Sequence, residues 1–170
     1  VGRLDMDSAG YMDVIRCKTA MLFEAAAHTG AVLASADASR LEALAAYGRE
    51  LGLAFQLIDD ALDYAGTTDR LGKNVGDDLA EGKMTLPLIH TLAHGTDKHA
   101  ALVREAIRAR DGDRFAEVRD AVQAAGAIEA TQQRARECAA HARSMTGHLP
   151  ASPHRDALVS LTEFAVARDF

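Results

Sequence analysis

Three aspartates stand within five residues of an otherwise apolar stretch, LAFQLIDDALDY, which holds no basic residue. Asp59 and Asp63 are four residues apart and Asp60 and Asp63 are three apart, so on a helix they form one polar stripe together with Gln56. Like charges at this spacing repel each other, and the carboxyl end of a helix disfavours anions. A hard divalent cation relieves both effects, because Mg2+ binds carboxylate oxygens. The spacing therefore predicts a magnesium site at these aspartates, and the alternative is a solvated acidic face.

Three lysines supply positive charge elsewhere in the chain. Lys18 falls on or beside the apolar stripe of an earlier helix, and a lysine there needs an anionic partner unless its stem runs along the stripe to water. Lys73 and Lys83 lie in a segment rich in glycine. Glycine lets the backbone approach a ligand closely, and lysine neutralises phosphate as a point charge. The carboxylates and lysines together favour a strongly anionic ligand bound with a metal ion.

The elements that must position these residues are helices. The chain is 48% hydrophobic with only 5% aromatic residues, which is typical of packed helices rather than of a β-sandwich. Apolar residues recur at helical spacing except over residues 65–85, which we expect to form a long ordered loop with one helical turn. We therefore expect an all-α antiparallel bundle, one domain over residues 1–170. The expected helices cover residues 8–33, 38–64, from about 86 onward, 97–109, 113–125, 127–145 and 153–168.

Charge and composition exclude several classes of protein. With a net charge of −6, the chain has no excess of basic residues of the kind that binds nucleic acid or an anionic membrane. Two cysteines, Cys17 and Cys138, make neither a disulfide framework nor a metal cluster. No apolar run approaches the length of a membrane span, and no signal peptide is present. These features indicate a cytoplasmic protein.

Three segments in register carry a resemblance to a known family. CKTAMLFEAA, FQLIDDALDY and GKNVGDDLAEGKMTLPLI are similar to the second half of trans-polyprenyl diphosphate synthases, members of the isoprenoid synthase family. The last helix, LTEFAVARDF, also resembles theirs, so the likeness covers essentially the whole chain. The segment GDDLAEGKMTLPLI is most similar to the corresponding segment of long-chain members of the octaprenyl and decaprenyl type. These members make side-chain precursors of respiratory quinones.

The resemblance implies an activity. Family members use Mg2+ to assist ionisation of an allylic diphosphate, and the cation then condenses with isopentenyl diphosphate to give a longer trans-polyprenyl diphosphate. They are usually homodimers. The resemblance assigns Asp59, Asp60 and Asp63 to the metal and Lys18, Thr19, Gln56, Lys73 and Lys83 to the diphosphate, with Lys18, Asp59 and Lys73 as catalytic residues.

The chain departs from the family pattern in one large respect. Family members carry two aspartate-rich motifs, and this sequence contains only the second, without the family's isopentenyl diphosphate residues. We therefore expect a carboxyl-terminal half of a synthase that is inactive alone. One alternative is a non-catalytic subunit or helical interaction module that modulates a full-length synthase. Another is a class I terpene cyclase, which would need a second metal motif that the helices after Leu86 do not show.

Overall fold

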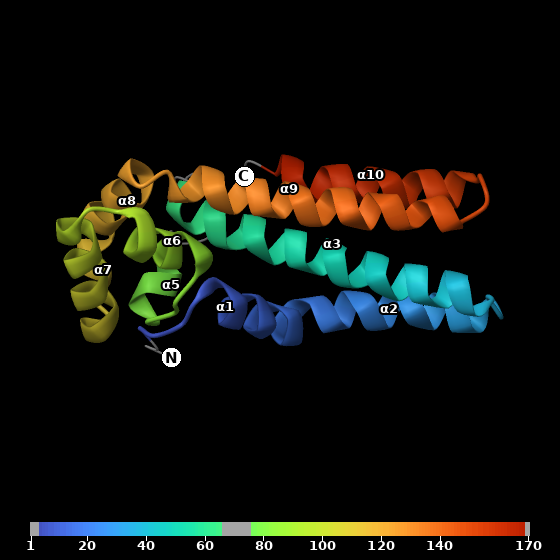
Figure 1. Ribbon diagram of the computed structural model, residues 1–170, viewed down its shortest axis with the longest axis horizontal. Helices are drawn as coiled ribbons and strands as arrows, with labels where there is room; N and C mark the ends of the chain where they lie inside the picture. Colours follow the sequence, from blue (N-terminus) through green and yellow to red (C-terminus); the bar gives the residue numbers. More distant parts are fainter. Residues whose placement is uncertain (1–3, 66–75, 169–170) are drawn as a thin grey trace. The chain divides into compact units, whose positions relative to one another are not determined.

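Every regular element that the structure describes is a helix (Figure 1). The structure is a computed structural model, and it describes residues 4–65 and 76–168. None of the described helices combines the length and apolarity that a bilayer span requires. The predicted all-α class is confirmed. The helices are α1 Ser8–Ile15, α2 Met21–Leu33, α3 Ala38–Ala65, α5 Asp77–Ala80, α6 Leu86–His94, α7 Asp97–Ala109, α8 Phe115–Ala124, α9 Ala127–Met145 and α10 Pro153–Ala167, with short π or 3-10 turns η1 Arg16–Ala20, η2 Gly112–Arg114 and η3 Thr146–His148.

The described residues group into two compact units. The first unit comprises residues 4–11, 59–65 and 76–132, and the second comprises residues 12–58 and 133–168. Helices α1, α3 and α9 contribute residues to both units.

The second unit is built from long helices lying side by side, namely α2, most of α3, most of α9 and α10 (Figure 1). Its core contains Tyr47 and Leu51 of α3. Two glycines of α3 let α2 and η1 approach closely, because a Cβ on Gly48 would lie 2.4 Å from the Phe23 carbonyl oxygen. A Cβ on Gly52 would lie 2.7 Å from the Cα of Ala20. Side-chain volume is therefore restricted on this face of α3.

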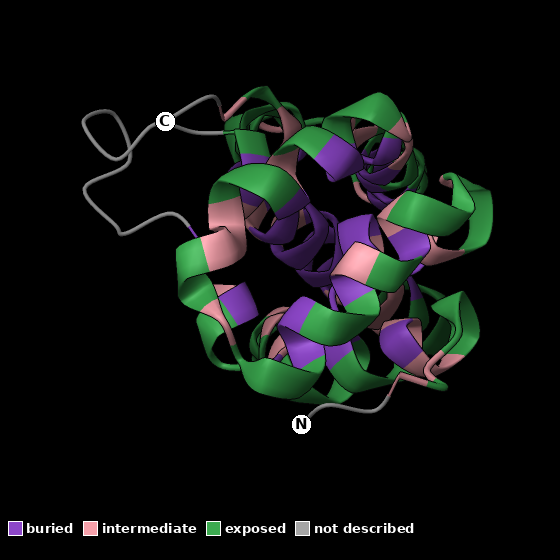
Figure 2. Ribbon diagram, turned by 90° about the vertical axis from the view of Figure 1, so that its left-hand side faces the viewer, coloured by how far each residue is buried: buried purple, intermediate pink, exposed green. Residues whose placement is uncertain are grey.

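The first unit contains the shorter helices. Helices α6, α7 and α8 pack against one another, and α5 packs against α7. Figure 2 shows that most helices are purple on one side and green on the other, as expected for amphipathic helices around a core. Fully buried aliphatic residues of this unit include Leu79, Leu88, Val103, Ile107, Val118 and Val122.

A π-helical turn, η1, interrupts the first predicted helix. Ile15 precedes this turn and Ala20 ends it, and these two buried residues stand five apart rather than the three or four of an α-helical face. Val14 and Leu22, which recur at helical spacing with the buried Ile15, are instead 47% and 76% exposed. The extra residue in the turn shifts the phase of the helix, so a pattern with constant spacing assigns some apolar residues to the wrong face.

Candidate functional site

The last two turns of α3 carry the three predicted metal ligands. Asp60 is buried with 4% of its surface exposed, and Asp59 and Asp63 are half-buried. The neighbouring apolar residues on α3 are buried as well, Leu57 and Ala61 completely. A solvated acidic face therefore does not describe this segment. Removing carboxylates from water costs free energy unless hydrogen bonds or cations compensate.

Asp60 is held by a tyrosine from α1. The Tyr11 hydroxyl donates a hydrogen bond to Oδ2 of Asp60 at 2.5 Å. Both side chains belong to the first unit, and Tyr11 is 2% exposed. Burial, and then the charge of Asp60, raise the pKa of Tyr11 far above its usual value, so the phenol remains protonated. This contact could not be predicted from the sequence, because no local signal joins residues so far apart along the chain.

The described residues hold Asp63 on one oxygen. Its Oδ1 accepts a hydrogen bond from the backbone N–H of Gly76 at 3.1 Å, while its Oδ2 is buried and has no hydrogen-bond partner within residues 4–65 and 76–168. Burial, and then the charge of Asp78, raise the pKa of Asp63 to about 6. A buried carboxylate oxygen without a donor is a natural ligand for a cation.

The aspartates do not form a closed metal cage. Across residues 4–65 and 76–168, no group of three or more His, Cys, Asp or Glu side chains is arranged to hold a metal ion. Mg2+ is ordinarily bound through one or two carboxylates, with water and substrate phosphate oxygens as its other ligands. The orphaned oxygen of Asp63, on the same helix as Asp59 and Asp60, fits an open site of this kind.

Lys83 lies among carboxylates of its own segment. Its Nζ is 2.7 Å from Glu81 and 3.0 Å from Oδ1 of Asp78. These hydrogen bonds, the one to Glu81 first, raise the pKa of Lys83 above its usual value. Its charge therefore lies close to Asp78, the residue whose own charge acts on Asp63. Lys73, the other predicted lysine of this segment, lies outside the described residues.

The second unit brings together another predicted pair. The Thr19 hydroxyl, in the π turn, donates a hydrogen bond to Oε1 of Gln56 at 2.7 Å. Gln56 is buried, and Lys18, next to Thr19, is exposed. Gln56 stands three residues before Asp59 in the sequence of α3.

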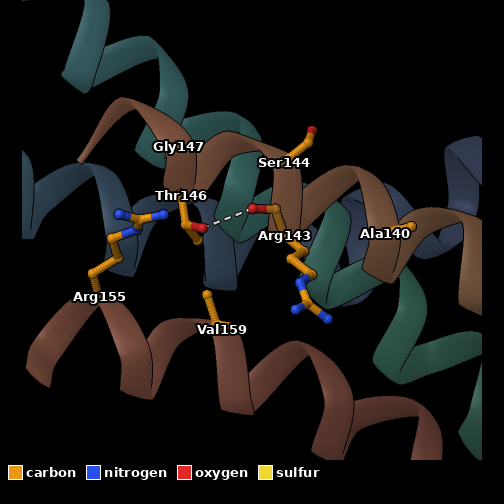
Figure 3. Close-up of a pocket in the computed structure, with 7 residues that line it drawn as sticks. All are labelled: Ala140, Arg143, Ser144, Thr146, Gly147, Arg155 and Val159. Carbon is orange, nitrogen blue, oxygen red and sulfur yellow. Dashed lines mark hydrogen bonds between the residues drawn. The ribbon is translucent and has the colours of Figure 1, made fainter. Parts of the chain in front are cut away.

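A separate cavity of about 420 Å3 opens between α9 and α10 (Figure 3). The Thr146 hydroxyl donates to the Arg143 carbonyl oxygen at 2.7 Å, and the Arg143 guanidinium pairs with Glu163 at 2.8 Å. The lining holds no carboxylate and none of the predicted site residues, so we assign it no chemistry. Its lining residues are Ala140, Arg143, Ser144, Thr146, Gly147, Arg155 and Val159.

Comparison with known proteins identifies the family that this sequence matches. The family model described as polyprenyl synthetase matches residues 2–125. The chain is 49% identical over 166 residues to octaprenyl diphosphate synthase of Escherichia coli (strain K12), covering 97% of this chain and 51% of that protein. It is 40% identical over 158 residues to the all-trans-nonaprenyl-diphosphate synthase (geranyl-diphosphate specific) of Rhodobacter capsulatus, covering 93% of this chain and 48% of that one.

A solved structure is similar as well. The polyprenyl synthase from Caulobacter crescentus CB15, complexed with calcium and isoprenyl diphosphate, aligns with a TM-score of 0.93 and 43% identity. The alignment covers 99% of this chain and 52% of that one. The chain thus spans about half the length of the proteins it matches.

Proposed function

The chain belongs to the polyprenyl synthetase family, and on that premise we propose that it supplies the allylic-diphosphate half of a long-chain trans-polyprenyl diphosphate synthase. The observation that carries the proposal is Asp63, whose buried Oδ2 lacks a hydrogen-bond donor in the part of the chain that the structure describes. A relative at 49% identity is an octaprenyl diphosphate synthase, and a similar structure holds calcium and isoprenyl diphosphate. Both names support a diphosphate substrate for this chain, and the calcium complex also supports a divalent cation.

The proposed reaction breaks the allylic C–O bond and releases diphosphate. The double bond of isopentenyl diphosphate then attacks the allylic cation, a new C–C bond forms, and loss of a proton gives a product one isoprene unit longer. Asp59, Asp60 and Asp63 would hold Mg2+, which would supply electrostatic stabilisation of the charge that develops on the leaving diphosphate. A low-dielectric, largely apolar setting increases the effect of each fixed charge.

The chain's own residues have distinct tasks in this proposal. Lys18, Lys73 and Lys83 neutralise diphosphate oxygens before and after ionisation. When substrate binds, the Lys83 ammonium replaces part of its contact with Asp78 by contact with the diphosphate. Both partners are anionic, so this ammonium group does not first have to be stripped of water as an unpaired cation would. The Thr19–Gln56 hydrogen bond fixes a polar group one turn before the aspartates.

The rest of the synthase supplies the first aspartate-rich motif and the isopentenyl diphosphate site. Apolar side chains of α2, including Met21, Leu22, Val32 and Leu33, are exposed in the second unit. We assign the covering of this face to the half of the synthase that the relatives possess and this chain does not span. The isolated chain should bind diphosphate weakly and elongate nothing. A homodimer is the expected assembly of the complete synthase.

Incorporation of radiolabelled isopentenyl diphosphate tests the proposal. In the complete synthase that contains this chain, Asp59→Ala should lower kcat by at least about 100-fold, because the lost contact acts mainly on charge that develops in the transition state. Asp120→Ala, on the exposed face of α8, is the matched control and should leave the rate unchanged. A wild-type rate in Asp59→Ala, or robust elongation by the isolated 170-residue chain, would overturn the proposal.

A further inference from the structure

Tyr11 is placed by the start of α1. The Asp7 carboxylate accepts a hydrogen bond from the backbone N–H of Gly10 at 2.8 Å, which caps the helix. The backbone N–H of Tyr11 then donates to the Asp7 carbonyl oxygen at 3.0 Å. Tyr11 therefore sits in a capped first turn, and its ring is almost wholly buried. Its hydroxyl is fixed before any ligand arrives.

The hydroxyl meets a residue proposed to bind metal. Its hydrogen bond to Oδ2 of Asp60 joins two buried side chains of the first unit, 49 residues apart in sequence. Burial leaves few rotamers to either side chain, and the contact restrains the Asp60 carboxylate at Oδ2. A carboxylate fixed in this way loses less conformational entropy when it binds a cation.

The chemical type of this partner matters. A lysine or arginine at position 11 would cancel the charge of Asp60 and compete with a cation for it. A phenol hydroxyl donates a hydrogen bond and carries no charge, so the carboxylate keeps its full attraction for a divalent ion. Hydrogen-bond partners of metal ligands in general raise metal affinity by about 10- to 100-fold.

We propose that Tyr11 is a positioning residue, which orients the Asp60 carboxylate for the divalent cation through the hydrogen bond from its hydroxyl. This inference rests on the proposed function of Asp59, Asp60 and Asp63 as the metal-binding group. It assigns to Tyr11 a role that requires one atom, the phenol oxygen, and not the ring alone.

The test uses the complete synthase that contains this chain. Tyr11→Phe keeps the ring and removes the donor. Tyr47→Phe is the matched control, because the Tyr47 hydroxyl also makes a hydrogen bond, to the Leu158 carbonyl oxygen at 2.9 Å in the second unit. For each variant, isopentenyl diphosphate incorporation is measured across a Mg2+ titration, Mn2+ binding by electron paramagnetic resonance, and Tm by circular dichroism.

Tyr11→Phe should raise the Mg2+ concentration for half-maximal rate, and the Kd for Mn2+, by about 10-fold, with much of the rate restored by excess Mg2+. Tyr47→Phe should lower Tm comparably and leave the Mg2+ requirement unchanged. In an Asp60→Asn background, Tyr11→Phe should cause no further loss of Mn2+ affinity, because the two residues act through one contact. Replacement of Tyr11 by p-aminophenylalanine, which retains a neutral donor, should restore the affinity even if Tyr11→Phe folds poorly.

The outcomes separate the two proposals. A wild-type enzyme whose incorporation needs no divalent cation would overturn the proposed function. A wild-type enzyme that needs Mg2+, with the same requirement in Tyr11→Phe or an equal shift in Tyr47→Phe, would overturn the role of Tyr11 alone.

Discussion

The backbone N–H of Gly76 donates a hydrogen bond to Oδ1 of Asp63 at 3.1 Å, so a loop glycine holds one oxygen of a proposed metal ligand. Gly76 has φ +88°, in the left-handed region, and a Cβ added to it would lie 2.5 Å from Cδ2 of Phe115. Both facts require glycine here. The position of this amide, and thus of its bond to Asp63, depends on a residue without a side chain.

Gly76→Ala should therefore destabilise the protein by about 1–3 kcal/mol, through backbone strain and the clash with the Phe115 ring. Urea unfolding followed by circular dichroism measures the change. Gly30→Ala is the matched control, because Gly30 lies within α2 and a Cβ there meets nothing within 4 Å. That substitution should raise stability by about 0.5–1 kcal/mol, since alanine has the higher helix propensity. Equal effects of the two substitutions would show that Gly76 is not under constraint.

Asp63 should make stability depend on pH in an unusual direction for an aspartate. Its folded pKa of about 6 exceeds the ordinary value of 3.8, so the folded state prefers the protonated form. Its contribution to stability is therefore lost as pH rises from about 4 to about 6, and the penalty is complete at pH 7.

Asp63→Asn should accordingly raise Tm at pH 7 by a few degrees, and this gain should disappear near pH 4. Thermal unfolding of the 170-residue chain in metal-free buffer from pH 4 to pH 7.5 measures both. Asp156→Asn, at an exposed aspartate of α10, is the control and should show no such crossover. A Tm difference between Asp63→Asn and wild type that stays constant over this range would contradict the raised pKa.

The Thr19–Gln56 hydrogen bond should contribute to both stability and substrate binding. Thr19→Val keeps the shape of the side chain and removes the donor to Oε1 of Gln56, which should cost about 1 kcal/mol of stability. In the complete synthase, the KM for the allylic diphosphate should rise several-fold, because the orientation of Gln56 is no longer fixed. Thr29→Val, at an exposed position of α2, is the control for β-branched shape. If Thr29→Val raised KM as much as Thr19→Val, the hydrogen bond would have no special role.

Lys83 should matter more for substrate than for stability. Its ion pairs with Asp78 and Glu81 are partly exposed, and such pairs contribute about 0–1 kcal/mol each. Lys83→Met should therefore shift the urea midpoint little and raise the KM for the allylic diphosphate about 10-fold or more, through loss of a charge on the diphosphate. Lys98→Met, at an exposed lysine of α7, should change neither quantity. A large loss of stability in Lys83→Met without a change in KM would mean that Lys83 is a structural residue.

The sequence predicted those features that depend on neighbours within one helix. The bounds predicted for residues 97–109 and 127–145 agree with α7 and α9, because glycine, threonine and aspartate mark these ends locally. The helical turn expected within residues 65–85 is α5. The predicted metal-site aspartates lie on one stripe of α3, because their spacing along the helix alone determines which face they occupy.

Contacts between distant residues could not be predicted in this way. Tyr11 and Asp60 meet only after the chain has folded, and the Gly76–Asp63 bond requires a backbone conformation that many glycines could adopt. The π turn was missed because a helical template of constant period has no place for an extra residue. Ile15 and Ala20 are buried five residues apart, and only the structure shows which apolar residues of this segment become buried.

That turn also bears on how many residues the chain can have at this place. Deleting one of the exposed residues Arg16 or Cys17 would leave Ile15 and Ala20 four residues apart, which is the spacing of one face of a regular α-helix. Both side chains could then stay buried, and Thr19 could keep its bond to Gln56. The π turn is thus a place where α2 and α3 can stay in contact after the loss of one codon, whereas a deletion inside a regular helix rotates one side against the other by roughly 100°.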